Sequence, residues 1–174
     1  MKSKNLLQIV SFMLILGLGF SNALAGSAVT YLGKTTWTAK ITQASDSKNI
    51  GGTFTVVGGI TKVGDEFYAF QGYVTPDNDG PFVMSGSGFL MGTTLLFTLS
   101  ESQEHTDNSW RDSGVMRVSL DQSTLNGTFY DIGLDYRTDT KVFDQRFSAG
   151  TLTRTGGYIS LISSTAATDL LLQD

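Results

Sequence analysis

Cysteine is absent from the 174 residues of the chain, and His105 is the only histidine. Without cysteine there can be no disulfide, no zinc–thiolate site and no thiol nucleophile. A serine–histidine dyad would have to use His105, and no Gly-x-Ser-x-Gly elbow surrounds any serine. A phosphate-binding loop is also missing. The sequence therefore assigns no catalytic residue, no metal and no cofactor, and it favours a role other than catalysis.

Basic residues are also scarce, with 12 Lys and Arg against 16 Asp and Glu and a formal net charge of −4. Lys2 and Lys4 precede a nearly continuous apolar run from Leu6 to Phe20, which Ala23-Leu24-Ala25 follows. This order is typical of a secretory signal peptide cut after Ala25. Because cutting removes two lysines and no acid, the mature chain has ten basic and sixteen acidic residues, a net charge of −6.

The net negative charge and the predicted signal peptide together indicate the compartment of the protein and exclude two classes of partner. Nucleic-acid binding needs a basic footprint, and docking on an anionic membrane needs basic clusters, so neither partner is expected. The apolar run is shorter than the roughly 20 residues of a membrane-spanning helix. We predict an exported protein, periplasmic or extracellular, with a signal peptide at 1–25, a barrel domain at 26–155 and a tail at 156–174. The tail is expected to form a short strand or a turn of helix.

Short β-branched and aromatic runs separated by glycine-rich turns fill the middle of the chain. They span 34–43, 51–63, 66–75, 82–90, 93–101, 110–120, 125–136 and 142–153. Regular spacing of this kind without helices between the runs favours an all-β fold. We predict a single antiparallel up-and-down β-barrel of about eight strands. Closing the sheet into a barrel leaves no edge strand exposed. A barrel of that size is either filled by side chains or holds one small ligand.

The first run, GKTTWTAKIT at 33–42, shows which side of its strand faces inward. Trp37, Ala39 and Ile41 fall on one face, and threonines and a lysine fall on the other. A charged outer face is costly in lipid, at about 2–4 kcal/mol for a basic residue near the midplane. The alternation therefore favours a soluble barrel over one that spans a membrane.

The last two runs also alternate, and an even-length turn at Thr138-Asp139 would pair them. The large apolar side chains of this hairpin are predicted to face inward: Tyr130, Ile132, Leu134, Phe143 and Phe147. Asp131 and Arg146 then form an ion pair on the wet outer face. This assignment conflicts with the preceding turn. A four-residue turn at 121–124 would pair Leu120 with Leu125 and place Phe129 on the inner face. A β-bulge at Asn126-Gly127 is predicted to restore the parity.

Two acidic stretches could be taken for metal sites. His105 lies near Glu101, Glu104 and Asp107, but a lone histidine in a polar loop is more simply a solvated residue. The stretch 77–80 has the letters of a calcium loop without its flanking ligands, so a turn is the better interpretation.

Gly33 and Trp37 at the start of the first strand, followed by an antiparallel meander, resemble the calycin-type barrels. That group includes lipocalins, fatty-acid-binding proteins and avidins. Lipocalins space the two residues as G-x-W, whereas this chain has G-x-x-x-W. The chain is loosely similar also to the small barrels of allene oxide cyclase and dirigent type. The resemblance implies the barrel architecture and no specific functional residue.

The leading hypothesis is an exported soluble β-barrel that binds a small apolar or amphiphilic ligand in its interior. The residues expected to line that site are Trp37, Phe97, Tyr130 and Phe143. One alternative is a cell-surface structural or interaction module with a filled barrel, contacting an unidentified protein through the loop that ends in Trp110. Another is a cofactor-free barrel enzyme of the cyclase or lyase type, which needs a buried acid or tyrosine with a shifted pKa.

Overall fold

A computed structural model describes residues 29–75, 82–104 and 110–159, which form one closed barrel of antiparallel strands. The strands are β1 (Thr30–Ala44), β2 (Thr53–Lys62), β3 (Phe67–Thr75), β4 (Phe82–Met91), β5 (Thr94–Glu104), β6 (Trp110–Asp121), β7 (Gly127–Arg137) and β8 (Val142–Ile159). A single 3-10 turn, η1 (Ser47–Asn49), follows β1. Each strand pairs with the next in sequence and β8 closes on β1. The predicted eight-stranded up-and-down barrel is confirmed.

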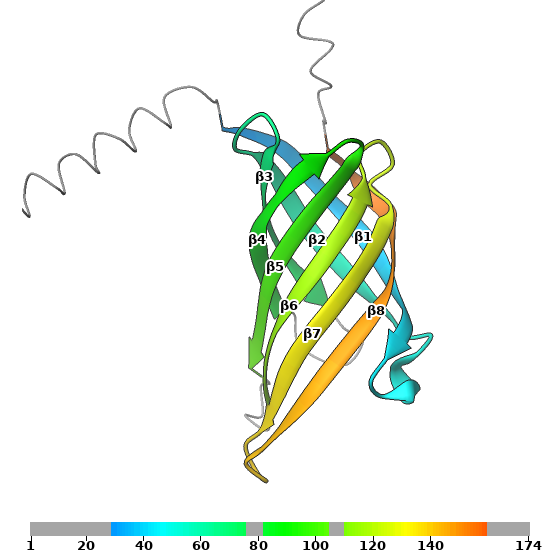
Figure 1. Cartoon of the computed structure of the whole chain (residues 1–174), viewed down its shortest axis with the longest axis vertical. Coiled ribbons are helices and arrows are strands. Elements are labelled where there is room, and N and C mark those ends of the chain that lie inside the picture. The colour runs from blue at the N-terminus through cyan, green and yellow to red at the C-terminus, as the bar shows by residue number, and fades with distance from the viewer. Residues whose placement is uncertain (1–28, 76–81, 105–109, 160–174) are drawn as a thin grey trace, which may run out of the picture.

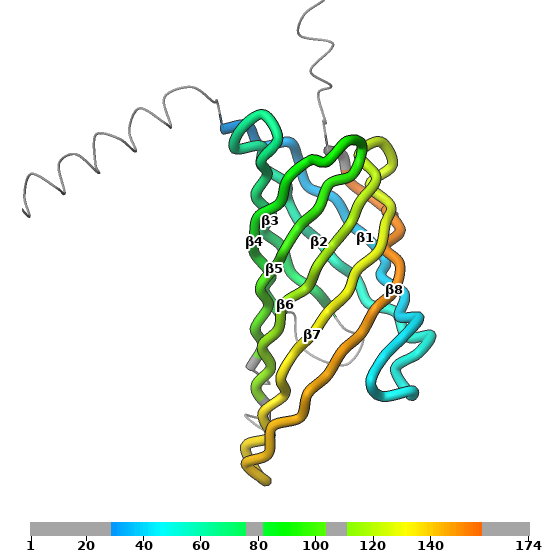
Figure 2. The backbone as a smooth tube through the Cα atoms, viewed as in Figure 1, coloured from blue at the N-terminus to red at the C-terminus, as the bar shows by residue number. Residues whose placement is uncertain are grey.

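The strands are steeply tilted, so the barrel is tall and has two distinct ends (Figure 1). The start of β1 and the end of β8 lie at one end, together with the short turns β2–β3, β4–β5 and β6–β7 (Figure 2). We call this the terminal end. The η1 segment and the projecting β7–β8 hairpin lie at the opposite, hairpin end. Within the described ranges, no helix has the length and apolarity needed to cross a bilayer.

The observed strands match the predicted runs closely, except that β8 continues to Ile159, past the predicted domain end at 155. The predicted signal peptide and the tail beyond Ile159 lie outside the described residues. His105 with Asp107 and the turn at 77–80 also lie outside them.

The indole of Trp37 is fixed at the terminal end beneath the β6–β7 turn. Trp37 is buried, and its Nε1 donates a 2.7 Å hydrogen bond to the carbonyl oxygen of Leu125. Leu125 has a left-handed backbone, with φ of 59°, and its side chain is buried in the core. The predicted inward face of the first strand is therefore confirmed, and Trp37 closes this end of the barrel.

Asp121 fixes the β6–β7 turn from the outside. Its Oδ1 accepts hydrogen bonds from the backbone and hydroxyl groups of both Ser123 and Thr124. The side-chain hydrogen bond from Ser123, with those from Thr124, lowers the pKa of Asp121 to about 2. This local chemistry holds the turn that presents the Leu125 carbonyl to Trp37.

Aromatic rings fill the middle of the barrel. The ring of Phe70 lies 6.2 Å from Trp37 and 6.1 Å from Phe97, measured between centroids. Glycine makes the room, since a Cβ at Gly58 would lie 2.2 Å from Phe70 and one at Gly88 would lie 2.5 Å from Phe97. The cavity left among these apolar side chains is about 20 Å³, which is hardly more than one water needs.

The β7–β8 hairpin has the opposite orientation to the predicted one. Ile132 pairs with Phe147, and Tyr136 pairs with Phe143 with ring centroids 4.7 Å apart. The apolar side chains do share one face, but that face is the outer wall. Exposed large apolar residues gather there: Val115, Tyr130, Ile132, Leu134, Phe143 and Phe147. We call this group the outer apolar patch. The inward placement predicted for the hairpin is therefore wrong.

The turn before β7 explains the inversion. Residues 121–126 lie between Leu120 and its partner Gly127, and the β6–β7 register is unbroken. No bulge occurs at Asn126-Gly127, contrary to the prediction. Phe129 points into the core, and the alternation of a strand then carries Asp131 and Asp135 inward as well.

Replacing Trp37 by Phe is expected to lower the free energy of unfolding by about 1–3 kcal/mol. The substitution keeps an aromatic ring in the core but leaves the buried Leu125 carbonyl without its donor, which costs that much for a buried polar group. Urea denaturation measures the effect. Tyr73→Phe, on the outer wall, is the matched control and should change stability by less than about 0.5 kcal/mol. Equal effects of the two substitutions would show that the Trp37 hydrogen bond does not stabilise the fold.

Candidate functional site

A single row of residues crosses four strands near the hairpin end of the interior. Glu101 of β5 pairs with Gly114 of β6, Gly114 with Gly133 of β7, and Gly133 with Arg146 of β8. The two central positions have no side chain. A Cβ at Gly114 would lie 2.8 Å from Oε1 of Glu101, and one at Gly133 would lie 2.7 Å from Cζ of Arg146. The glycines thus provide the space through which Arg146 reaches Glu101.

Arg146 contacts three carboxylates there. Its Nη2 lies 2.6 Å from Oε1 of Glu101, its Nε lies 2.8 Å from Oδ1 of Asp135, and its Nη1 donates to Oδ2 of Asp131. The side chains of Glu101 and Asp131 are only 2% and 3% exposed. We call these four residues the mouth cluster. The mouth cluster has three acidic groups and one basic group, so it carries excess negative charge when all of them are ionised.

The charge imbalance shifts the proton affinity of the acids. Burial and the negative charge of Glu101 raise the pKa of Asp131 to about 7, although Arg146 opposes this. Burial likewise raises the pKa of Asp135, with Asp112 of β6 adding to the shift. Burial alone would lower the pKa of Arg146, but its carboxylate partners raise it overall, so the guanidinium stays charged.

Two carboxylate oxygens in the cluster, Oε2 of Glu101 and Oδ1 of Asp131, accept no hydrogen bond from any described residue in the ionised form. A proton on Asp131 allows a hydrogen bond to Glu101, which is one of the causes of its raised pKa. The cluster can therefore hold one proton near neutral pH. It can instead offer two buried acceptors to a donor that comes from outside.

A cavity of about 340 Å³ opens next to the cluster, between the η1 segment and the barrel interior. We call it the mouth cavity. Three residues of the mouth cluster line it: Glu101, Asp131 and Arg146. Its apolar wall comes from five strands: Ile41, Phe54, Val74, Phe82 and Met116. A concave apolar wall that ends in a few polar groups is the usual form of a small-ligand site, and barrel mouths are a usual place for one.

The residues predicted to line a ligand site do not come together. Trp37 and Phe97 lie inside, in the filled core. Tyr130 and Phe143 lie on the outer wall, 45% and 67% exposed, so their predicted inward placement is wrong. The reason is the strand parity that Phe129 sets, because it turns this face of β7 and its partner face on β8 outward.

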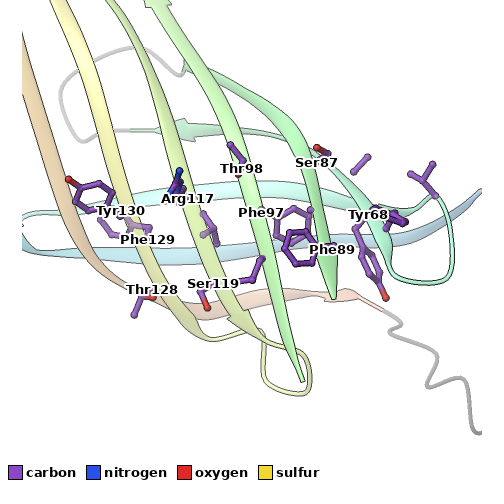
Figure 3. A pocket seen from close by; sticks show the side chains of 16 residues that line it. Tyr68, Ser87, Phe89, Phe97, Thr98, Arg117, Ser119, Thr128, Phe129 and Tyr130 are labelled. Atoms are coloured by element: carbon purple, nitrogen blue, oxygen red, sulfur yellow. The ribbon is translucent and has the colours of Figure 1, made fainter. Parts of the chain in front are cut away.

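The outer wall has a larger hollow, but one of different character. A groove of about 1000 Å³ runs over β3–β7, where short side chains lie between large ones. Figure 3 shows one row of its lining with Ser87, Thr98, Arg117 and Tyr130, and a second row with Ser119 and Thr128. It has no buried acid, and its one described charge, Arg117, is exposed. We therefore place the candidate site in the mouth cavity.

Sequence reasoning missed the mouth cluster because it treated Asp131 and Arg146 as a surface pair. One signal was present. Gly133 lies between Asp131 and Asp135 on the same strand face, and Gly114 precedes Met116 on the adjoining strand. Glycines on a charged face indicate that long side chains need room there, which a solvated face does not require.

The stability of the fold should fall as the pH rises from about 4 to about 7. In this range the folded chain keeps the Asp131 proton that the unfolded chain, with a pKa of 3.8, has lost. The folded state then binds more protons, so the contribution is full below about pH 4 and lost above about pH 7. Urea denaturation between pH 4 and 8 measures it.

Asp131→Asn has no proton to lose and should flatten this part of the pH profile. Asp144→Asn removes a half-exposed acid on the same hairpin, 3.3 Å from Arg137, and should keep the wild-type slope. A slope that Asp131→Asn leaves unchanged would mean that another group causes it.

Gly133→Ala is expected to lower the free energy of unfolding by about 1–3 kcal/mol, the usual cost of overpacking. The new methyl group would displace the Arg146 guanidinium from its partners. Gly156→Ala is the control in the neighbouring strand, since its Cβ would meet nothing closer than 3.9 Å. Comparable losses in both variants would indicate a general cost of alanine in these strands.

No protein-family model matches the chain, and no match was found among curated proteins or among solved structures. Function is therefore inferred from the geometry and chemistry of the described residues.

Proposed function

We propose that the protein is an exported β-barrel that binds a small amphiphilic molecule in the mouth cavity. The supporting observation is the cavity of about 340 Å³, whose wall is apolar and whose inner end carries buried charged groups. Apolar burial contributes about 0.8 kcal/mol per methylene group, and the charged end fixes orientation. The resemblance to small-ligand barrels agrees with this proposal.

The binding site differs from the one expected from the sequence. The centre of the barrel has room for about 20 Å³ only, so the ligand does not pass into the core. It binds instead above Phe54, Phe82 and Met116, with its polar group toward Glu101 and Asp131. The filled core then acts as the rigid base of the site.

The outer wall supports the further proposal that the barrel does not span a membrane. A spanning barrel needs an apolar band around its whole circumference. Here Lys34, Lys40 and Arg117 are exposed on the wall among serines and threonines, and large apolar side chains lie between them. A basic residue facing lipid near the midplane costs about 2–4 kcal/mol. The outer apolar patch lies over β6–β8, and further large apolar side chains are exposed on other strands: Tyr31, Phe67, Tyr73, Val83, Phe89 and Met91. The outer surface of the described strands is therefore mixed, with basic and hydroxyl side chains between the apolar ones.

Octan-1-ol is a suitable first probe, and isothermal titration calorimetry is the measurement. Ser148 lines the mouth cavity, so Ser148→Phe should fill part of it. Displacing about two methylene groups costs about 1.6 kcal/mol, which is a roughly tenfold increase in Kd. Ser87→Phe fills part of the outer groove instead and should leave the Kd unchanged.

The two variants separate the sites. Loss of binding in Ser87→Phe alone would place the site in the outer groove and overturn the assignment to the mouth cavity. Absence of any alcohol binding, together with a ligand-free protein on extraction and mass spectrometry, would overturn the proposed function.

Acid–base catalysis is the second candidate, favoured by one observation. Asp131 is buried beside a cavity and has a pKa of about 7, which suits proton transfer at neutral pH. A small-molecule extract incubated with the wild type and with Asp131→Asn distinguishes the candidates. Consumption of a compound by the wild type alone supports an enzyme, whereas recovery of every compound unchanged supports a binding protein.

A further inference from the structure

We propose that the ligand of the mouth cavity carries a protonated amine, which binds against Glu101 and Asp131 while the apolar part lies along the cavity wall. This inference rests on the proposed function and specifies the ligand class. The amine inference concerns only the polar end of the mouth cavity, so it can be wrong even if the cavity binds amphiphiles.

The charge of the mouth cluster favours a cationic head group. Three carboxylates surround one guanidinium, and each of the three Arg146 nitrogens already contacts a carboxylate. An anionic head would approach an excess of negative charge and would have to displace Glu101, Asp131 or Asp135 from Arg146. A cationic head reduces the excess and can bind while Arg146 keeps its three carboxylate partners.

Two oxygens of the cluster lack a hydrogen-bond donor among the described residues. Oε2 of Glu101 and Oδ1 of Asp131 belong to side chains that are almost fully buried, and neither accepts a hydrogen bond from a described residue. An ammonium group has three donors and no acceptor. Charge-assisted hydrogen bonds to carboxylates are about twice as strong as neutral ones. Neighbouring atoms cover both oxygens in the empty site, so we expect the two side chains to turn toward the cavity as the ammonium group binds.

The size and lining of the mouth cavity fit an organic cation. Among the described residues, no group of three or more acidic or histidine side chains is arranged to hold a metal ion. The cavity is also in the range of organic ligands, about 300–1000 Å³, rather than of a single ion. The apolar wall contributes to the binding free energy only if the cation carries a carbon chain that it can bury.

Binding of the amine should release a proton. Below about pH 7, a proton on Asp131 in the empty site removes one of the two excess negative charges of the cluster. The ammonium replaces it, so the reaction is protein–COOH plus R–NH₃⁺ giving the ion-paired complex and H⁺. The other charged groups that face this position are Glu101 from β5, Asp135 from β7 and Arg146 from β8. Asp112 of β6 faces Asp135, and Lys48 lies on the cavity wall after β1.

Three probes of equal chain length test the head group on the full mature chain: octylamine, octan-1-ol and octanoate. At pH 8 octylamine, protonated like lysine, should bind about tenfold more tightly than octan-1-ol, and octanoate more weakly than either. Below pH 7 the amine affinity should fall by up to about tenfold per pH unit, because Asp131 must lose its proton. Below pH 7, where Asp131 holds its proton, titrations in two buffers of different ionisation enthalpy should reveal the released proton.

Asp131→Asn and Glu101→Gln should each bring octylamine to the affinity of octan-1-ol, and Asp144→Asn should retain the preference. Proton release in the wild type keeps the test valid if either cluster variant unfolds. Equal binding of all three probes, or a preference for octanoate, overturns the amine inference while leaving amphiphile binding in place. A preference that survives both cluster variants overturns the assignment to Glu101 and Asp131. Failure of every probe overturns the proposed function itself.

Discussion

The arrangement of the hairpin end depends on the charge of Arg146 inside the barrel. A guanidinium without partners in a protein interior is strongly destabilising, and it is tolerated only with close, well-oriented acceptors. Glu101, Asp131 and Asp135 supply those acceptors from two other strands. Polar residues therefore occupy the inward face of β7 and β8 at this end. Because side chains alternate along a strand, the apolar residues between them lie on the outer wall.

This arrangement divides the interior into two parts with different physical properties. Toward the terminal end the rings of Trp37, Phe70 and Phe97 pack closely and leave almost no free volume. Toward the hairpin end the glycine row removes two side chains and admits a long charged one. The first part is a rigid packed core, and the second contains a cavity lined by buried charged side chains. The proposed binding site lies at the boundary between them, where Met116 contributes to both linings.

The sequence predicted the strands, their order and the closure, because alternation and turn residues are local signals. It did not predict which face of the last hairpin is inside, because alternation defines two faces without saying which one the core takes. Tyr130, Ile132 and Phe147 suggested an inner face on hydrophobicity alone. The inward position of Phe129 gives the correct parity, and the predicted bulge at Asn126-Gly127 is absent from the β6–β7 pairing. Glu101 joins the site from a strand far away in sequence, so spacing could not reveal the mouth cluster.

The seam between β1 and β8 sets the order in which the fold can be completed. Thr35 donates a side-chain hydrogen bond to the carbonyl oxygen of Gly156, 121 positions later in the chain. Every other strand pair joins neighbours across a short connection, but this one closes almost the whole domain as a single loop. Pairing at such long range is slow, because the entropy of loop closure is lost before the contacts form. We expect β1 and β8 to pair last, and until they do the two unpaired strand edges are open to pairing with other chains.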